Sequence, residues 1–343
     1  MTFSFSQKLR VFVIQLIIQA IWLVDITSAY LKSGILAAFI IFTVFATGIY
    51  KLPSIVAKDA IFFREGLVAS MYPRQSIFVA NNVLGAATYR QIPFVANKIP
   101  MPTFSAKSIL VMDATRDKVL LDINSSRQLA PASTTKLMTA LVALDLYALT
   151  DTLTVPYLCT LNDSQRVGLK EGTAYFVKDL LYGLLVDSGG DCACTLAVGK
   201  VDVGEFVNLM NQKAVDFGLS GTHFTNPVGF DGSHYSTAYD LYQLAKKAVS
   251  VDLIHKIVAT KSYSFASVDA KDTITIFNTN KLLWDLPGSI GVKTGQTQEA
   301  GEVLVYEYRD VTKTLISVVM GSQDRFADTK AALDWVFQSY SWK

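Results

Sequence analysis

Long apolar runs dominate the first fifty residues, whereas shorter, periodic apolar runs follow after residue 104. Residues 33–50 carry no charged side chain, and 18 helical residues at 1.5 Å each just cross a hydrocarbon core of about 30 Å. We therefore predict a transmembrane helix at 33–50, because no adjacent amphipathic elements could cover it as a core helix. The run at 11–24 is interrupted by Gln15 and Gln19. It fits an interfacial helix, a second span or a signal-peptide core.

Prolines interrupt the next stretch. Residues 51–104 show no sustained hydrophobic period, and they contain Pro53, Pro73, Pro93, Pro100 and Pro102. This pattern predicts a stalk or linker, with short helices near 59–70 and 76–87.

From residue 105 the pattern alternates between strand and helix periods. Two strands are expected within 108–124, around a polar turn at Ala114–Lys118, and a hairpin is expected at 301–321. Helices are predicted at 133–148, 203–217, 236–250 and 325–340, and two more lie within 163–198 on either side of a break at Ser188–Gly190. Strands at both ends with helices between them favour a mixed α/β (α+β) fold. In such a fold an antiparallel sheet is flanked by helices, with a helical subregion.

Charge is distributed unevenly along the 343 residues, whose formal net charge is +2. Residues 1–104 hold nine Lys/Arg and three Asp/Glu, whereas residues 105–343 hold 22 Lys/Arg and 26 Asp/Glu. Neither part is strongly basic, so we expect no nucleic-acid partner.

The three cysteines are Cys159, Cys192 and Cys194, an odd number with no Cys-x-x-Cys spacing. We predict three buried thiols that act as small hydrophobic side chains. Since no Cys/His cluster is present, we expect no metal site and no cofactor.

A lysine at the start of an apolar helix is the first sign of chemistry. The segment "APASTTKLMTA" (130–140) places Ser133 at the start of the predicted helix and Lys136 one turn later on the same face. Free N–H groups at this end of the helix can stabilise an oxyanion. Burial would lower the pKa of the lysine and make it a base for the serine hydroxyl. Taken alone, the motif also fits a capped helix with a surface lysine.

A second motif favours a catalytic Ser133–Lys136 pair over a capped helix with a surface lysine. The segment "GVKTGQTQEAG" (291–301) places Lys293, Thr294 and Gly295 on a predicted strand just before the hairpin. The lysine and threonine offer a cation and a hydroxyl to a carboxylate, and the glycine lets a substrate backbone approach the strand. Ser-x-x-Lys followed by Lys-Thr-Gly is the motif set of penicillin-binding proteins and serine β-lactamases.

Residues 105–343 resemble the D-alanyl-D-alanine carboxypeptidase family, which comprises low-molecular-mass penicillin-binding proteins with a β-lactamase/transpeptidase-like fold. The segments that carry the resemblance are "LAPASTTKLMTALVAL" (129–144), "LLVDSGGDCA" (184–193), "TNPVGFDGSHYSTAYDLYQLA" (225–245), "NTNKLL" (278–283) and "GVKTGQTQEAG" (291–301).

The resemblance implies a role for each matching residue. Ser133 would be the acylated nucleophile, Lys136 the general base, and Ser188 a relay that passes a proton to the leaving amine. Lys293 and Thr294 would hold the terminal carboxylate of a peptidoglycan stem peptide that ends in D-Ala-D-Ala. The backbone N–H groups of Ser133 and Gln296 would form the oxyanion hole. β-Lactams would be covalent inhibitors of the same serine.

One position departs from the family pattern. The second motif is Ser-x-Asn in the family, whereas this chain reads Ser188-Gly189-Gly190. The missing amide leaves two alternatives to a carboxypeptidase open: a weakened penicillin- or peptidoglycan-binding homologue, and a peptidoglycan endopeptidase. A β-lactamase is disfavoured, because no Glu-x-x-Leu-Asn string occurs, and a histidine-based triad is disfavoured, because His234 reads as part of a helix start.

The implied substrate also suggests a topology. Peptidoglycan lies outside the membrane, so the sequence predicts a single-pass protein of the cell membrane with an extracytoplasmic catalytic domain. The expected segments are a cytoplasmic tail (1–32), the transmembrane helix (33–50), the stalk (51–104) and the catalytic domain (105–343).

Overall fold

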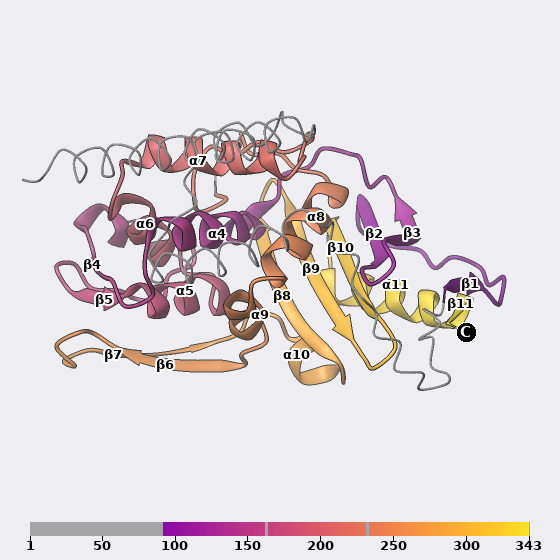
Figure 1. The fold of residues 1–343 in the computed structure, drawn as a ribbon. Coiled ribbons are helices and arrows are strands. Elements are labelled where there is room, and N and C mark those ends of the chain that lie inside the picture. Colours follow the sequence, from indigo (N-terminus) through magenta and orange to yellow (C-terminus); the bar gives the residue numbers. More distant parts are fainter. Residues whose placement is uncertain (1–91, 162–163, 231–232, 343) are drawn as a thin grey trace, which may run out of the picture. The chain divides into compact units, whose positions relative to one another are not determined.

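The computed structural model describes residues 92–161, 164–230 and 233–342 (Figure 1). The span expected at 33–50, the run at 11–24 and the two expected stalk helices all lie outside these residues. Within the part of the chain that the structure describes, no helix is both long and apolar enough to cross a membrane.

A five-stranded sheet forms the centre of the described fold, in the order β3-β2-β10-β9-β8. Every neighbouring pair is antiparallel. The strands are β2 (Ser108–Asp113), β3 (Lys118–Ile123), β8 (Ser289–Thr297), β9 (Gly301–Arg309) and β10 (Thr314–Ser322). The antiparallel sheet expected from strands at both ends of the domain is confirmed. The hairpin of β9 and β10 closes where the sequence predicts it.

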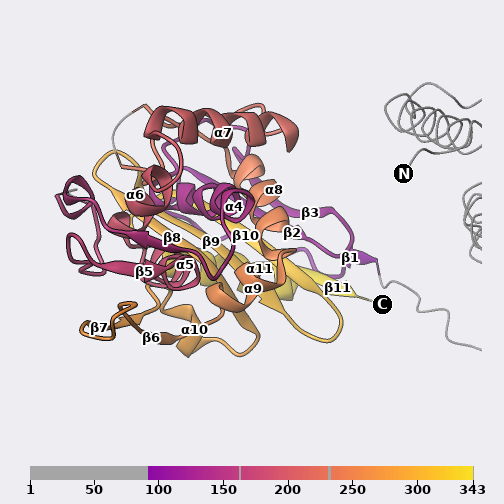
Figure 2. The same cartoon turned by 60° about the vertical axis from the view of Figure 1, so that its left-hand side comes forward.

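Helices cover both faces of this sheet, which explains why β2 reads as a continuous apolar run. Leu110 and Met112 belong to the core that contains α8 (Ala238–Val249). Ile109 and Val111 belong to a second core with α11 (Arg325–Ser339). Because successive strand side chains point to opposite faces, α8 and α11 pack on opposite sides of the sheet. Figure 2 shows the sheet between its helices from a second side.

A helical subregion packs beside the sheet. It consists of α4 (Lys136–Leu146), α5 (Val177–Val186), α6 (Gly190–Val198), α7 (Val203–Asp216) and α9 (Asp252–Val258). Every residue of α4 from Lys136 to Ala143 is buried, so this helix lies at the centre of the subregion with no solvent-facing side there. The predicted helices are therefore present, with ends shifted by a few residues.

Several short elements are not predicted from the sequence. They are η2 (Tyr157–Thr160), α10 (Leu282–Asp285), and the two-stranded pairs of β4 (Thr152–Thr154) with β5 (Ala174–Phe176) and of β6 (Ser262–Ala266) with β7 (Thr273–Phe277). Their apolar runs are too short to separate a strand from a loop by periodicity.

The described chain begins and ends in one small sheet. Strand β1 (Pro93–Val95) pairs with β11 (Tyr340–Trp342), and Ala96 N–H donates to the carbonyl of Ser339. The sequence places residues 93–95 in the linker, but their partner strand lies at the other end of the chain. Packed structure therefore starts before residue 105.

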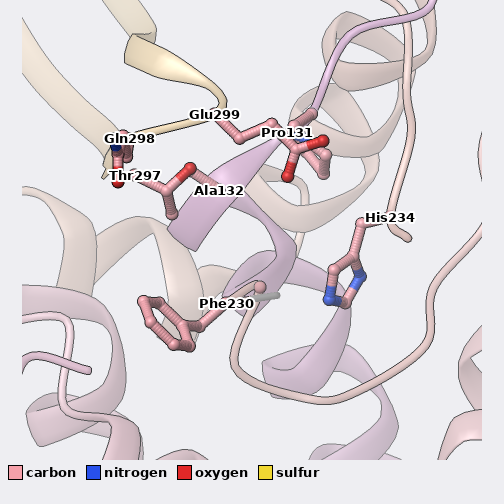
Figure 3. A pocket seen from close by; sticks show the side chains of 9 residues that line it. Pro131, Ala132, Phe230, His234, Thr297, Gln298 and Glu299 are labelled. Atoms are coloured by element: carbon pink, nitrogen blue, oxygen red, sulfur yellow. The ribbon is translucent and has the colours of Figure 1, made fainter. Parts of the chain in front are cut away.

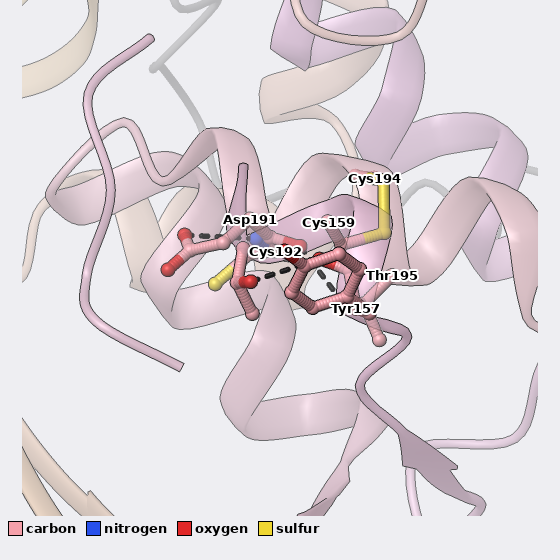
Figure 4. Close-up of a disulfide and its surroundings, with 7 residues drawn as sticks. Tyr157, Cys159, Asp191, Cys192, Cys194 and Thr195 are labelled. Carbon is pink, nitrogen blue, oxygen red and sulfur yellow. Dashed lines mark hydrogen bonds between the residues drawn. A yellow bond between two sulfur atoms is a disulfide. The ribbon is translucent and has the colours of Figure 1, made fainter. Parts of the chain in front are cut away.

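The prediction of three free thiols is wrong. Cys159 and Cys194 form a disulfide that joins η2 to α6 (Figure 4), and only Cys192 is a free, buried thiol. Cys192 and Cys194 point to different sides of α6, so one reaches Cys159 and the other packs in the core. The sequence separation of 35 residues between Cys159 and Cys194 gave no local signal of this pairing.

Candidate active site

Ser133 and Lys136 meet at the junction of a 3-10 turn and a helix. Ser133 lies in η1 (Ala132–Thr135), and Lys136 is the first residue of α4. The Lys136 Nζ donates to Ser133 Oγ at 2.8 Å and to the carbonyl of Val228, also at 2.8 Å. The sequence pattern predicts that Ser133 begins the α-helix, whereas Ser133 lies in the 3-10 helix η1, directly before α4. The pairing of the two side chains is as predicted.

The turn that presents Ser133 is held by close backbone packing. Ala132 has a φ of 49°, a left-handed conformation that costs energy in any residue with a Cβ. A Cβ on Gly229 would lie 2.1 Å from the Ala132 carbonyl oxygen. Only glycine therefore fits at position 229, and it allows the loop that carries Val228 to press against the nucleophile turn.

Burial gives Lys136 the properties of a base. Its side chain is fully buried, and this desolvation lowers its pKa to about 7, although the charges of Cys192 and Asp191 oppose the shift. Desolvation disfavours the charged form of a lysine. An appreciable fraction of Lys136 is therefore neutral near pH 7, with its nitrogen within hydrogen-bonding distance of a serine oxygen.

The Lys-Thr-Gly segment lies on β8 beside Ser133. A Cβ on Gly295 would lie 3.0 Å from Ser133 N, so β8 passes directly against the backbone N–H of the serine. Thr294 Oγ1 bonds Thr279 Oγ1 at 2.5 Å. Burial lowers the pKa of Lys293 well below its usual value, and the charges of Lys136 and Arg325 lower it further. An incoming anion would reverse this shift, so the segment is suited to a carboxylate.

The second motif lies at the tight connection between α5 and α6. Ser188 is buried and has a φ of 65°. The residues around it act on both lysines: the charge of Asp187 raises the pKa of Lys293, and the charge of Asp191 raises that of Lys136. The connection therefore lies near enough to both lysines for the charges of its carboxylates to act on them.

Arg325 is a site residue that the sequence reasoning missed. Its Nη1 donates to the Gly295 carbonyl at 2.8 Å, and its backbone N–H donates to Glu302 Oε2 at 2.9 Å. Arg325 is the first residue of α11, the helix that follows β10. Only the sheet order brings it to Lys293, and no local motif marks it.

A pocket adjoins the nucleophile turn (Figure 3). It is lined by Ala130, Pro131, Ala132, Gly229, Phe230, His234, Thr297, Gln298 and Glu299. Phe230 and Glu299 face it from opposite sides in Figure 3. Because its walls are the residues before Ser133 and after Gln296, a peptide bound along β8 would extend into it. Among the described residues, no group of three or more His, Cys, Asp or Glu side chains could hold a metal ion.

Comparison with known proteins agrees with this geometry. The family model of D-alanyl-D-alanine carboxypeptidase (peptidase S11) matches residues 95–324. D-alanyl-D-alanine carboxypeptidase DacB2 of Mycobacterium tuberculosis is 38% identical over 61% of this chain and 72% of its own length. DacF of Bacillus subtilis is 34% identical over 68% of this chain, but the match spans only 63% of DacF.

Solved structures show the same fold. The DD-transpeptidase of Streptomyces K15 superposes with a TM-score of 0.66 at 31% identity, over 70% of this chain and all of that one (100%). A D-alanyl-D-alanine carboxypeptidase from Mycobacterium tuberculosis superposes with a TM-score of 0.65 at 34% identity, over 71% of this chain and 95% of that chain. With the Ser133–Lys136 pair set against the Lys-Thr-Gly strand, the chain belongs to the D-alanyl-D-alanine carboxypeptidase family of serine peptidases.

Proposed function

We propose that this protein removes the terminal D-alanine from peptidoglycan stem peptides through an acyl-serine intermediate. The observation that carries the proposal is the 2.8 Å contact between Lys136 Nζ and Ser133 Oγ, in a site where burial lowers the pKa of the lysine to about 7. A serine is a weak nucleophile until a positioned base accepts its proton.

Acylation proceeds in one addition and one elimination. Neutral Lys136 accepts the Ser133 hydroxyl proton as Oγ attacks the carbonyl carbon of the penultimate D-alanine. The backbone N–H groups of Ser133 and Gln296 stabilise the resulting oxyanion. The carbon–nitrogen bond then breaks, and the proton passes by way of Ser188 to the leaving amine, which departs as D-alanine. Water attacks the ester in the second half of the reaction and restores the serine.

The terminal carboxylate of the substrate binds at the Lys-Thr-Gly segment of β8. Lys293 and Thr294 supply a cation and a hydroxyl, and the Arg325 guanidinium lies beside Gly295. The charge of Arg325 contributes to the lowered pKa of Lys293, and an anion that enters the site would favour the charged form of this lysine. This feature favours a substrate with a free carboxylate next to the scissile bond.

We also propose that residues 33–50 anchor the protein in the cell membrane, with the catalytic domain outside the cytoplasm. The proposal is supported by the uncharged 18-residue run and by the location of peptidoglycan beyond the membrane. The remaining N-terminal run at 11–24 would then lie at the interface, because a second span would return the catalytic domain to the cytoplasm.

The enzymatic proposal is tested by incubating the full-length protein with a fluorescent penicillin and, separately, with a pentapeptide that ends in D-Ala-D-Ala. We expect covalent labelling together with release of D-alanine, and loss of both in Ser133→Ala. Labelling without turnover would favour the binding homologue. Cleavage of crosslinked peptides with no release from the pentapeptide would favour an endopeptidase.

A further inference from the structure

The loop at residues 224–230 supplies the second oxygen that the Lys136 nitrogen contacts. Lys136 Nζ lies 2.8 Å from Ser133 Oγ and 2.8 Å from the carbonyl oxygen of Val228. Position 190 is a glycine, so the second motif provides no side-chain acceptor there. The Val228 carbonyl therefore holds the lysine nitrogen beside the serine, and the conformation of the loop determines where this carbonyl points.

A second side chain of α4 holds the same loop one turn further along the helix. Thr139 Oγ1 donates to the carbonyl of Pro227 at 2.6 Å. Lys136 and Thr139 are three positions apart, so their side chains lie on the same face of α4. Two successive loop carbonyls thus accept hydrogen bonds from one helix face. These two contacts fix the loop against the helix that carries Lys136.

The shape of the loop comes from the side chain of Asn226. Its Oδ1 accepts hydrogen bonds from the backbone N–H groups of Val228 at 3.0 Å and Gly229 at 2.9 Å, and its Nδ2 donates to the Phe230 carbonyl at 2.6 Å. An asparagine that bonds the backbone two residues further on forms an Asx turn. All three bonds go to the loop backbone, so Asn226 acts on Lys136 through the Val228 carbonyl.

We propose that Asn226 is a positioning residue for the acylation of Ser133. Its Asx turn directs the Val228 carbonyl at Lys136 Nζ and thereby keeps this nitrogen within reach of the serine oxygen. The inference rests on the proposed function, in which Lys136 accepts the serine proton. Proton transfer requires donor and acceptor within about 2.6–3.2 Å, so a displaced loop slows acylation even in a folded protein.

The test is the rate of acylation of the full-length protein by a fluorescent penicillin, measured as a function of pH. Asn226→Ala removes all three bonds, and the rate near pH 8 should fall on the order of tenfold or more. The midpoint of the decrease at acidic pH should move down by about half a unit, because a carbonyl binds a protonated lysine more strongly than a neutral one. The charges of Asp191 and Cys192, which also act on Lys136, and that of Lys293 are unchanged in this variant.

Two further variants separate positioning from stability. Asn226→Asp keeps the oxygen that accepts both N–H groups, so its rate should stay within about threefold of the parent. Asn211→Ala is the matched control, because Asn211 also makes three backbone hydrogen bonds, two of them to Phe224 at the start of the same loop. It should lower Tm about as much as Asn226→Ala but change neither the rate nor the midpoint.

The inference is overturned if Asn226→Ala stays within about twofold of the parent with the same midpoint. It is also overturned if Asn211→Ala reproduces both changes, or if Asn226→Asp loses as much as Asn226→Ala. Should Asn226→Ala fail to fold, Asn226→Ser replaces it, with an intermediate loss expected from its weaker turn. A parent that is acylated but releases no D-alanine contradicts the proposed function, while the acylation rates still test Asn226.

Discussion

At the scale of single residues, the site depends on how burial lowers the pKa values of Lys136 and Lys293. Lys136 and Lys293 are both almost completely buried, yet of the two only Lys136 has its nitrogen next to the Ser133 hydroxyl. The Lys293 nitrogen donates to the Thr294 carbonyl at 3.1 Å. In the mechanism proposed above, the same residue type therefore has two functions, and the groups around each nitrogen determine which one.

The rate of acylation should follow the protonation of Lys136. Only the neutral lysine accepts the serine proton, and the pKa of Lys136 is about 7. The rate should therefore fall about fifteenfold between pH 7 and pH 5.5 and level off above pH 8. Rapid-mixing measurements with a fluorescent penicillin provide the check. Burial raises the pKa of Asp187 to about 6, so this carboxyl titrates in the same pH range as Lys136. Asp187→Asn should therefore be measured in parallel, and the decrease in rate below pH 7 should persist in this variant. A flat profile would exclude Lys136 as the base.

Arg325 should contribute to substrate binding more than to the chemical step. Arg325→Gln removes a cation next to Lys293 but leaves the Ser133–Lys136 pair in place. KM for a D-Ala-D-Ala peptide should rise by about tenfold or more, and kcat should stay within a few-fold. Arg127→Gln, at an exposed arginine, is the control and should change neither constant. An equal loss in kcat with unchanged KM would contradict a binding role.

Short motifs explain which site residues are visible in the sequence. Ser133 and Lys136 are three positions apart, and Lys293 and Thr294 are adjacent, so each pair is fixed by one local element. Arg325 reaches the site only through the sheet order. Its position depends on tertiary packing, and a single sequence carries no local pattern for it.

At the scale of elements, α6 is held at two points. The Asp191 carboxylate ties the start of α6 to the preceding segment, and the disulfide of Cys194 ties the middle of the helix to η2. The helix start carries the second motif, so its position relative to Lys136 depends on these restraints. The sequence reasoning foresaw the helix break at Ser188–Gly190 but neither restraint.

The disulfide makes a prediction about thiol chemistry and stability. Denatured, unreduced protein should react with one equivalent of a thiol reagent, from Cys192 alone. A crosslink across 35 residues contributes on the order of 3–4 kcal/mol in the loop-entropy model. Dithiothreitol should therefore lower Tm by on the order of 10 °C, and Cys192→Ala should remove the reactive thiol without changing that shift. Three reactive thiols in the unreduced protein would show that the bond is absent.

At the scale of the whole molecule, the periodic part of the sequence predicts the fold well. The order of strands and helices after residue 105 predicts an antiparallel sheet flanked by helices, because strands lie at both ends of this part with helices between them. The pairing of β1 with β11 could not be predicted. Three-residue strands carry too little pattern, and their partners lie at opposite ends of the described chain.

The proposed membrane anchor gives a test on the full chain. If 33–50 spans the membrane, full-length protein should remain in the pellet after extraction with alkaline carbonate and should be released by detergent. Replacing Ile40 and Ile41 with Asp should shift it to the soluble fraction, because each acidic residue at a helix centre costs about 2.5–3.5 kcal/mol on insertion. A reporter fused after residue 343 that is active only in the cytoplasm would contradict the orientation.

The small sheet of β1 and β11 also determines how the domain responds to a mechanical load. The chain enters the described fold at residue 92, and three residue pairs hold its first strand to the last one. A pull on residue 92 therefore separates β1 from β11 before it loads the five-stranded sheet. If residues 33–50 anchor the chain as proposed, tension would be absorbed by this pair of strands before it reached the alignment of β8 with Ser133.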